Sequence, residues 1–310
     1  LFRSMKISVA IPTVGRDSIK ATLRTLERQT YRPFEVLVIN QGRPAPKEWL
    51  DFDLPLRILN QSERGVARAR SCALDSFSGD WVLFTDDDQE VNAEWCEQLV
   101  KLIESYPGAT FFGGSVFPPP IYDKATEFVS QLYIPGEIVL DESTYLRPFD
   151  TSGMLADLWG GNYALSRTCV DAVGTYDEFL GRGSGFCEAG EDTDFAMRAI
   201  TKGFTGILSC RLIVYHTYGV RPIEENSGEE PIEVAALLAW KARRDPANVS
   251  PILASRLQAY GRKKAVLARV TGGKLYGGEA QRESVYLNMT ARLDSGYRVV
   301  DGRIVPGTVG

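Results

Sequence analysis

The sequence predicts an α/β protein in which a mostly parallel central sheet is flanked by helices and followed by a helix-rich C-terminal extension. The first half alternates short apolar runs with amphipathic stretches, which is the pattern of consecutive strand and helix units that feed a parallel sheet. Hydrophobic residues make up 44% of the 310 positions, enough for one large domain with an appendage. From residue 229 onward the apolar spacing becomes mainly helical, which predicts the extension.

The elements of the first half follow from this spacing. Predicted strands occupy residues 7–11, 35–39, 56–59 and 81–85. In the first predicted helix Ile19, Leu23 and Leu26 recur at helical spacing and form one apolar face. The predicted helices of this half occupy residues 17–29, 66–77 and 93–105.

The second half opens on three prolines at residues 118–120, which can continue neither a strand nor a helix. They predict an irregular excursion that ends near Trp159. Beyond it we expect strands at residues 162–165 and 207–216 and helices at residues 167–173, 193–202, 232–240 and 251–268. The resulting division is a main domain over residues 5–227, split near residue 118, and an extension over residues 228–310.

The composition excludes several kinds of chemistry. With one histidine, His216, the chain has neither an HExxH zinc site nor a multi-histidine cage, so acid-base and metal chemistry must depend mainly on carboxylates. The five cysteines form no CxxC pair, no apolar run reaches the length of a membrane span, and residues 1–6 lack the apolar core of a signal peptide. We therefore expect a cytoplasmic protein, with peripheral contact at the inner face of the membrane as an option.

Charge divides the chain in the same place as the element pattern. Residues 1–227 carry a net charge of −10 and residues 228–310 a net charge of +5. A cation site is expected in the acidic part and a docking surface in the basic part.

Three adjacent carboxylates, Asp86, Asp87 and Asp88, directly follow the strand predicted at residues 81–85. Adjacent like charges repel one another, and ligands bind beyond the carboxyl ends of strands in open α/β sheets. A hard cation such as Mg²⁺ or Mn²⁺ prefers oxygen ligands and would offset the repulsion. The alternative is a solvated acidic turn, and the position at a strand end favours a cation site over it.

A second acidic cluster, Glu191, Asp192 and Asp194, lies at a predicted helix start. Capping and the helix dipole favour acidic residues in a first turn by themselves, so this cluster also has a purely structural explanation. The glycine-rich segment 181–185 before it is of the kind that folds over a ligand. This neighbour favours a functional role.

Taken together, these segments resemble glycosyltransferase family 2, the inverting nucleotide-sugar enzymes of GT-A fold. The resemblance covers about residues 5–220 and is carried, in family order, by residues 9–13, 65–71, 86–88, 160–165, 173–178, 190–194 and His216. Each segment is short, and their shared order makes the resemblance specific. It implies a GT-A catalytic domain over residues 5–227, with residues 5–117 as the nucleotide-binding half and residues 118–227 as the acceptor and catalytic half.

The resemblance also implies roles for single residues. Contacts to the nucleotide sugar are implied for Pro12, Thr13, Asn40, Gln41, Arg70, Asp86, Asp87, Gly161 and Asn162. A divalent cation, Mn²⁺ or Mg²⁺, is implied at Asp88, with His216 adding a metal or phosphate contact. Asp192 is the implied general base and Glu191 its substitute. The implied reaction moves a sugar from a nucleoside-diphosphate sugar, UDP-sugars favoured, to a hydroxyl of a glycan, glycolipid or small molecule with inversion.

Two positions depart from the family pattern. Family members commonly have an acidic pair where Asn40 and Gln41 stand, and the carboxylate accepts a hydrogen bond from uracil N3. An Asn carbonyl can accept the same bond, so uracil is compatible with the change. Ser71 replaces the usual Asn after Arg70, and neither change touches the residues expected to meet the diphosphate and cation.

The basic part contains residues 241–274, with nine Lys and Arg and a single acid, Asp245. A basic helical stretch with apolar residues such as Leu253 and Leu257 is typical of contact with an anionic membrane or an acidic acceptor. The alternative is a helical subdomain that packs on the core and leaves its charges in solvent. Nucleic acid is not expected, because the pI is near 5.2, and the oligomeric state is open.

Two other functions fit part of the pattern. A sugar-phosphate nucleotidyltransferase shares the architecture and an acidic metal site, but it requires a glycine-rich basic phosphate loop where only residues 14–16 stand. A catalytically inactive nucleotide-sugar-binding module has no use for intact Asp86, Asp88 and Asp192.

Overall fold

The computed structural model describes residues 5–119, 131–149, 155–219, 230–259 and 291–307, together with residues 124, 127–128, 221–222 and 289. Nine strands form its central sheet, which is mixed and mostly parallel. They are β1 (Ile7–Thr13), β2 (Glu35–Asn40), β3 (Leu56–Asn60), β4 (Trp81–Thr85), β5 (Glu90–Val91), β6 (Phe111–Phe117), β8 (Glu137–Leu140), β9 (Asn162–Ser166) and β10 (Gly206–Tyr215).

The strand order β3-β2-β1-β4-β9-β6-β10-β5 places the apolar strands in the middle of the sheet, and β8 also pairs with β10. Every residue of β1, β2, β4 and β9 is buried, as expected where helices cover both faces. The β1–β2 register pairs Thr13 with Asn40, so these two strands end side by side. Antiparallel β9 pairs Asn162 with Thr85, which brings the chain before β9 to the end of β4.

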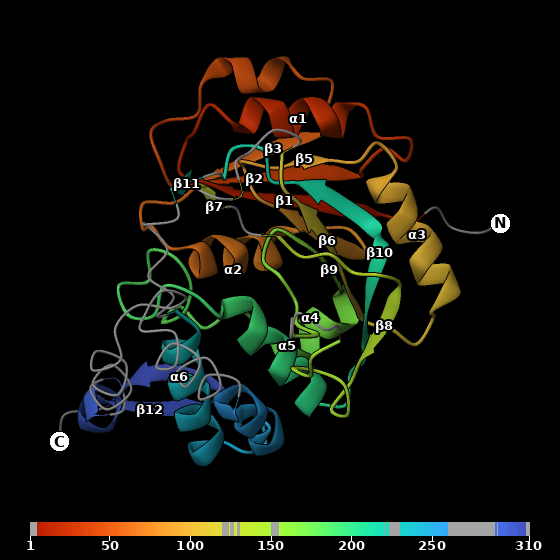
Figure 1. Cartoon of the computed structure of the whole chain (residues 1–310). Helices are drawn as coiled ribbons and strands as arrows, with labels where there is room; N and C mark the ends of the chain where they lie inside the picture. Colours follow the sequence, from red (N-terminus) through yellow and green to blue (C-terminus); the bar gives the residue numbers. More distant parts are fainter. Residues whose placement is uncertain are drawn as a thin grey trace.

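Helices cover the sheet on both sides. They are α1 (Ile19–Glu27), α2 (Val66–Ser76), α3 (Trp95–Ser105), α4 (Arg167–Val173) and α5 (Glu191–Thr201), with a short 3₁₀ helix at Lys47–Asp51. Figure 1 shows α1 and α3 on one side of the sheet and α2, α4 and α5 on the other. The amphipathic pattern of α1 is confirmed, because Ile19, Leu23 and Leu26 are buried. Prediction of an α/β fold with a mostly parallel sheet is thus confirmed.

Several strands lie outside the sequence prediction. β6 occupies a central position, yet its glycines weaken the strand signal. Those glycines are required by close packing, because a Cβ at Gly114 would lie 2.4 Å from both Leu212 and the Asn162 amide. The excursion expected over residues 118–159 also contributes β8 to the sheet, and β7 (Glu127–Phe128) pairs with β11 (Arg221–Pro222).

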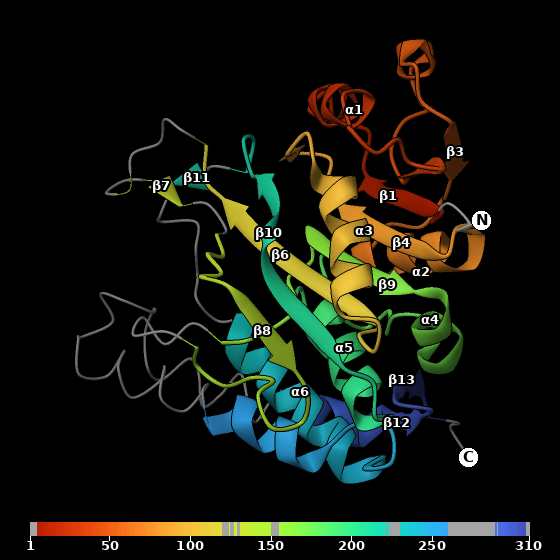
Figure 2. The same ribbon diagram turned by 90° about the vertical axis from the view of Figure 1, so that its right-hand side faces the viewer.

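The C-terminal extension is helical at first, with α6 (Glu230–Arg244) followed by helical residues 251–259. The rest of the helix predicted to residue 268 lies outside the described residues. A hairpin of β12 (Tyr297–Val300) and β13 (Arg303–Pro306) follows, which the helical prediction did not include. Figure 2 shows α6 and this hairpin next to α5, on the side away from β1. In the described part of the chain, no helix combines the length and apolar character needed to cross a membrane.

Candidate functional site

Four parallel strands, β1, β2, β4 and β10, end at one edge of the sheet. Asp86, Asp87 and Asp88 follow β4, and His216 follows β10. Because these strands share their direction, side chains from distant parts of the sequence meet at this edge. The structure therefore places the three carboxylates at a strand end, as the sequence predicted.

Three side chains hold the acidic cluster. Thr13 Oγ1 donates to Asp87 Oδ2 at 2.5 Å, and Arg16 Nη1 lies 3.2 Å from Asp87 Oδ1 and 3.1 Å from Asp88 Oδ2. His216 Nε2 is 3.2 Å from Asp88 Oδ1. The sequence singled out Thr13 and His216, whereas Arg16 was considered only as part of an inadequate phosphate loop. The position of Arg16 in the first strand-to-helix turn is the sequence feature that could have identified it as a site residue.

The three carboxylates differ in acidity because their partners differ. Burial alone would raise the pKa of Asp88, but the hydrogen bond with His216 and the positive charges nearby outweigh it and lower that pKa. Burial raises the pKa of Asp87 to about 6 despite its bonds with Thr13 and Arg16. Burial also raises the pKa of Asp86, with partial relief from the Arg70 charge.

Arg70 of α2 connects this cluster to the second one. Its side chain is 3% exposed, Nη2 donates to the Gly160 carbonyl at 2.6 Å and lies 3.4 Å from Asp86 Oδ1, and Nη1 bonds with Glu191 Oε1. One guanidinium thereby joins the carboxylates after β4 to the first residue of α5. Its pKa lies well above the ordinary value: burial opposes the charge, but Tyr163 and the surrounding carboxylates favour it.

The glycine pair before β9 is explained by close approach to this arginine. A Cβ on Gly160 would lie 2.6 Å from Arg70 Nη2, and one on Gly161 would lie 2.0 Å from Gln89 Nε2 and 2.8 Å from Asp86 Oδ2. The pair therefore makes room for the side chains of the site.

Asp192, the predicted base, lies in the first turn of α5. Its pKa is raised well above the ordinary value, first by burial and then by the negative charges of Glu191 and Asp157. Asp157 was not identified from the sequence; its carboxylate accepts bonds from Thr193 Oγ1 at 2.8 Å, from Leu158 N at 2.7 Å and from the Tyr145 hydroxyl. Burial raises the pKa of Asp157 to about 6. Asp157 and Asp192 are thus two partly buried acids of raised pKa near the start of α5.

Asn40 and Gln41 are buried at the end of β2, and their amides bond within the protein. Asn40 Nδ2 donates to Asn60 Oδ1 at 2.9 Å, and Gln41 Nε2 donates to Gln61 Oε1 at 2.9 Å. Beside them a cavity of about 400 Å³ is lined by Gly42, Pro44, Ala45, Ile58 and Asn60. None of the catalytic candidates lines this cavity, so it belongs to the β2 and β3 end of the edge.

Two other predicted contacts are internal. Asn162 is fully buried: it accepts from Trp95 Nε1 at 2.8 Å and donates to the Ser115 carbonyl at 2.8 Å, which holds β9 against its neighbours. Pro12 is buried in β1 beside Ile39. The structure thus places both within the sheet rather than among the polar groups of the cluster.

The carboxylates suit a divalent cation that arrives with a phosphate ligand. Among the residues that the structure describes, no three His, Cys, Asp or Glu side chains form a metal-binding group by themselves. Mg²⁺ commonly binds through one or two carboxylates while substrate phosphates complete its shell. Asp86 and Asp88 offer such oxygens at the strand end, with His216 next to Asp88, so the donor set fits this mode of binding.

The basic stretch 241–274 is described only up to residue 259. In that part Lys241 is fully buried, and Leu253 and Leu257 join the core, whereas Ile252 is exposed. This packing favours the subdomain alternative for residues 241–259, and the predicted membrane contact of residues 260–274 lies outside the described residues.

A mostly parallel sheet with carboxylates after β4 and at the start of α5 defines the protein as one of GT-A fold. Solved structures agree: S. aureus TarS 1–349 aligns with a TM-score of 0.60 at 15% identity, over 98% of this chain and 96% of that one. The mannosyltransferase PcManGT from Pyrobaculum calidifontis, solved with GDP-Man and Mn²⁺, aligns with a TM-score of 0.55 at 15% identity, over 94% of this chain and 81% of that one. At these identities the likeness establishes the fold alone.

Sequence comparison gives the family. The model of Glycosyl transferase family 2 matches residues 8–150. The model of Glycosyl transferase family group 2 matches residues 81–242, and this second match covers more than half of the chain. The chain belongs to glycosyltransferase family 2.

The similar proteins of described activity or pathway share only about a quarter of their aligned residues with this chain. Glucosyl-dolichyl phosphate glucuronosyltransferase from Haloferax volcanii is 27% identical over 186 residues, which are 57% of this chain and 58% of that protein. Succinoglycan biosynthesis protein ExoM from Rhizobium meliloti is 25% identical over 257 residues, 78% of this chain and 72% of that protein. The chain spans little more than half the length of the first of these relatives.

Proposed function

We propose that the protein transfers a sugar from a nucleoside-diphosphate sugar to an acceptor hydroxyl, with inversion at the anomeric carbon. The observation that carries this proposal is the position of Arg70, which contacts both Asp86 after β4 and Glu191 at the start of α5. A group for the leaving phosphate and a group for the attacking hydroxyl thus belong to one connected site. Family membership favours sugar transfer over nucleotidyl transfer.

The donor side is built from the β1, β2 and β4 ends. We place the diphosphate at Asp86 and Asp88 and the nucleoside along Thr13, Asn40 and Gln41. A Mn²⁺ or Mg²⁺ ion held by Asp88, with Asp86 and His216 beside it, would act as a Lewis acid toward the leaving diphosphate. Arg16 adds a positive charge at the mouth of this site, where its side chain is 52% exposed.

The acceptor side is the first turn of α5. Asp192 takes the proton of the acceptor hydroxyl as its oxygen attacks the anomeric carbon, and the nucleoside diphosphate leaves with the electron pair of the broken bond. One displacement from the face opposite the leaving group inverts that carbon. A raised pKa suits this role, because the carboxylate then binds the transferred proton more tightly than an ordinary aspartate does.

A UDP-sugar is the donor that we favour. The Asn40 carbonyl accepts from Gly42 N at 3.2 Å and has a second lone pair for the N3 proton of uracil, and Gly42 lines the cavity at the β2 end. S. aureus TarS 1–349 has the same fold and has been solved in complex with UDP-GlcNAc. That structure aligns with this chain with a TM-score of 0.60. The acceptor is proposed only as a hydroxyl of a glycan, glycolipid or small molecule.

The test begins with a thermal-shift screen of nucleoside diphosphates, each with and without Mn²⁺. We expect UDP with Mn²⁺ to raise Tm most, and a hit with another base would replace the uracil assignment. Calorimetry of UDP with Mn²⁺ should then show that Asp88→Ala loses the metal-dependent part of binding. Undiminished binding by this variant would refute its role.

Turnover distinguishes an enzyme from an inactive binding module. We expect slow hydrolysis of the bound donor without an acceptor, and release of sugar in the inverted configuration. Binding with no turnover, in the presence of a panel of hydroxyl acceptors, would favour the inactive module, and a retained configuration would exclude single displacement.

A further inference from the structure

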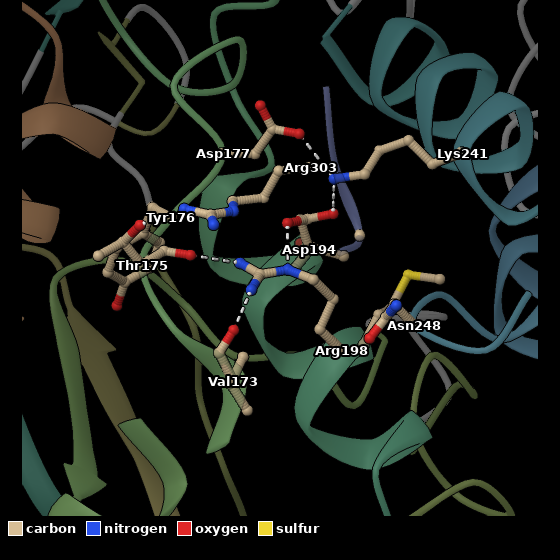
Figure 3. Close-up of polar contacts among 12 residues, drawn as sticks. Val173, Thr175, Tyr176, Asp177, Asp194, Arg198, Lys241, Asn248 and Arg303 are labelled. Carbon is tan, nitrogen blue, oxygen red and sulfur yellow. Dashed lines mark hydrogen bonds and ion pairs between the residues drawn. The ribbon is translucent and has the colours of Figure 1, made fainter. Parts of the chain in front are cut away.

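Four fully buried charged side chains form a cluster at the first turn of α5 and behind it. They are Asp177, Asp194, Arg198 and Lys241, two of each sign. Lys241 Nζ donates to Asp177 Oδ2 at 2.7 Å and to Asp194 Oδ1, and Arg198 Nε donates to Asp194 Oδ2 at 2.9 Å (Figure 3). Such groups can be buried because each charge has an opposite partner.

The cluster joins α5 to parts of the chain that are distant in sequence. Lys241 belongs to α6, and Arg198 donates to the carbonyls of Val173 and Thr175 at 2.9 Å each (Figure 3). From β13, Ile304 N donates to Asp177 Oδ2 at 2.8 Å. The basic extension therefore reaches into the interior of the catalytic part through one lysine.

This contact lies next to the proposed base. Asp194, which Lys241 binds, follows Asp192 by two residues in the same helical turn. On the other side, Gly190 has φ +87°, and a Cβ there would lie 2.6 Å from Val234 of α6. Helix α6 thus contacts the chain both before and after Glu191 and Asp192.

We propose that Lys241 is a positioning residue for sugar transfer, which holds Asp194 and Asp177 so that the first turn of α5 presents Asp192 to the acceptor. The proposal rests on the proposed function for its catalytic consequence. Stability alone is a weak reason for this cluster, because buried ion pairs can often be replaced by apolar groups without loss. Orientation of a base is a stronger reason, since small displacements of catalytic groups are costly in rate.

The test uses a charge-balanced variant. Lys241→Met alone would leave two buried aspartates with one cation and destabilise the fold strongly. Lys241→Met combined with Asp177→Asn removes one charge of each sign and leaves the buried ion pair of Asp194 with Arg198 intact. Arg244→Met is the matched control, because Arg244 lies on the same helix but pairs with Asp294 at the surface.

For the double variant we expect kcat to fall by about tenfold to a hundredfold, with the KM for the donor and the calorimetric affinity for UDP unchanged. Hydrogen exchange in peptides spanning α5 should be about tenfold faster than in the wild type, while peptides from β1 and β4 keep their rates. The control should match the wild type in all of these.

A folded double variant with wild-type kcat and wild-type exchange over α5 would overturn the proposal. If the wild-type protein itself transfers no sugar, the proposed function fails, and the exchange over α5 then decides alone whether Lys241 holds this turn. Faster exchange over α5 without a change in kcat would also refute the positioning of the base.

Discussion

Asp192 is the residue on which the proposed chemistry depends most. Its raised pKa has a cost for the fold, because an acid that holds its proton more tightly when folded loses native stability as the pH rises from about 3.9 through the raised value. A base that is useful to the reaction is therefore expected to be unfavourable for stability at neutral pH.

The substitution Asp192→Asn tests both consequences. We expect transfer to fall by about 10² to 10⁴-fold, because the amide cannot take a proton, while UDP binding is retained. We also expect a higher Tm at pH 7, since a buried ionisable group is replaced by a neutral one. Steady-state kinetics, calorimetry and a thermal melt give the three readouts.

The control is Asp171→Asn on α4, whose side chain is exposed. It should leave kcat and Tm near their wild-type values. An Asp192→Asn variant that still turns over at the wild-type rate would move the base elsewhere, with Glu191 the next residue to test.

The pH dependence of kcat should reveal the pair formed by Asp192 and Asp157. Transfer needs the ionised base, so kcat falls as the pH falls through its raised pKa. The Asp157 charge contributes to that rise, so Asp157→Asn should lower the pKa of Asp192 and shift the acid limb to lower pH. Since Asp157 itself titrates at about 6, the wild-type limb should also be broader than that of the variant.

The pH profile is measured for both proteins with the same donor and acceptor. An acid limb that stays in place in Asp157→Asn would show that the pair is not coupled in the active enzyme. A limb that moves to higher pH would contradict the assignment of Asp192 as the base.

At the residue scale, sequence reasoning singled out the candidate residues that have a recognisable local sequence pattern. Asp86 and Asp88 stand at a strand end and Asp192 at a helix start, so local pattern and family resemblance both mark them. Arg16 and Asp157 could not be assigned in this way, because their roles depend on partners from distant segments: Arg16 meets the carboxylates after β4, and Asp157 meets Thr193.

At the scale of elements, the sequence predicted accurate bounds where a segment is clearly apolar or clearly delimited. It missed a strand where glycines interrupt the apolar pattern. β4 and α4 were predicted at the residues where they occur, since one is a continuous apolar run and the other a short segment between a strand and Gly174. β6 was missed although it is central, because its two glycines reflect packing against neighbours that the sequence does not reveal.

The glycine pair before β9 provides a prediction at this scale. Gly161→Ala would place a methyl group 2.0 Å from Gln89 Nε2, so either Gln89 or the turn must move. Gln89 Oε1 accepts from Thr85 Oγ1 at 3.0 Å and from Asp86 N at 3.3 Å, so its displacement would disturb the β4 end. We expect a loss of stability of about 1 to 3 kcal/mol and weaker UDP binding in calorimetry with Mn²⁺.

Gly174→Ala is the comparison, because no atom lies within 4 Å of a Cβ there, although its φ of +81° makes the substitution strained. It should lower Tm without changing the affinity for UDP. Equal effects of the two substitutions on UDP binding would show that Gly161 has no particular relation to the site.

At the scale of the whole molecule, the question is whether the extension is separate. The charge asymmetry and the change of pattern after residue 228 predicted a distinct C-terminal part, and the hairpin β12–β13 adds strands to it. The described core runs without interruption from the sheet through α5 to Leu237, Leu238 and Trp240 of α6. Sequence alone could not show this, because Lys241 reads as a surface charge and its buried partners are 47 and 64 residues away.

Because the core is continuous, we expect a destabilising substitution in α6 to lower the stability of the sheet as well. Trp240 is fully buried, and Trp240→Ala should lower the free energy of unfolding by about 3 to 5 kcal/mol. The loss should appear equally in denaturant-dependent hydrogen exchange of peptides from α6 and from β4, because both open in one transition. Ile252→Ala, at a position that is 52% exposed in the same extension, should change neither by more than about 0.5 kcal/mol. If Trp240→Ala accelerates exchange in α6 while β4 keeps its wild-type opening energy, the extension unfolds on its own, and the boundary near residue 228 separates two folding units.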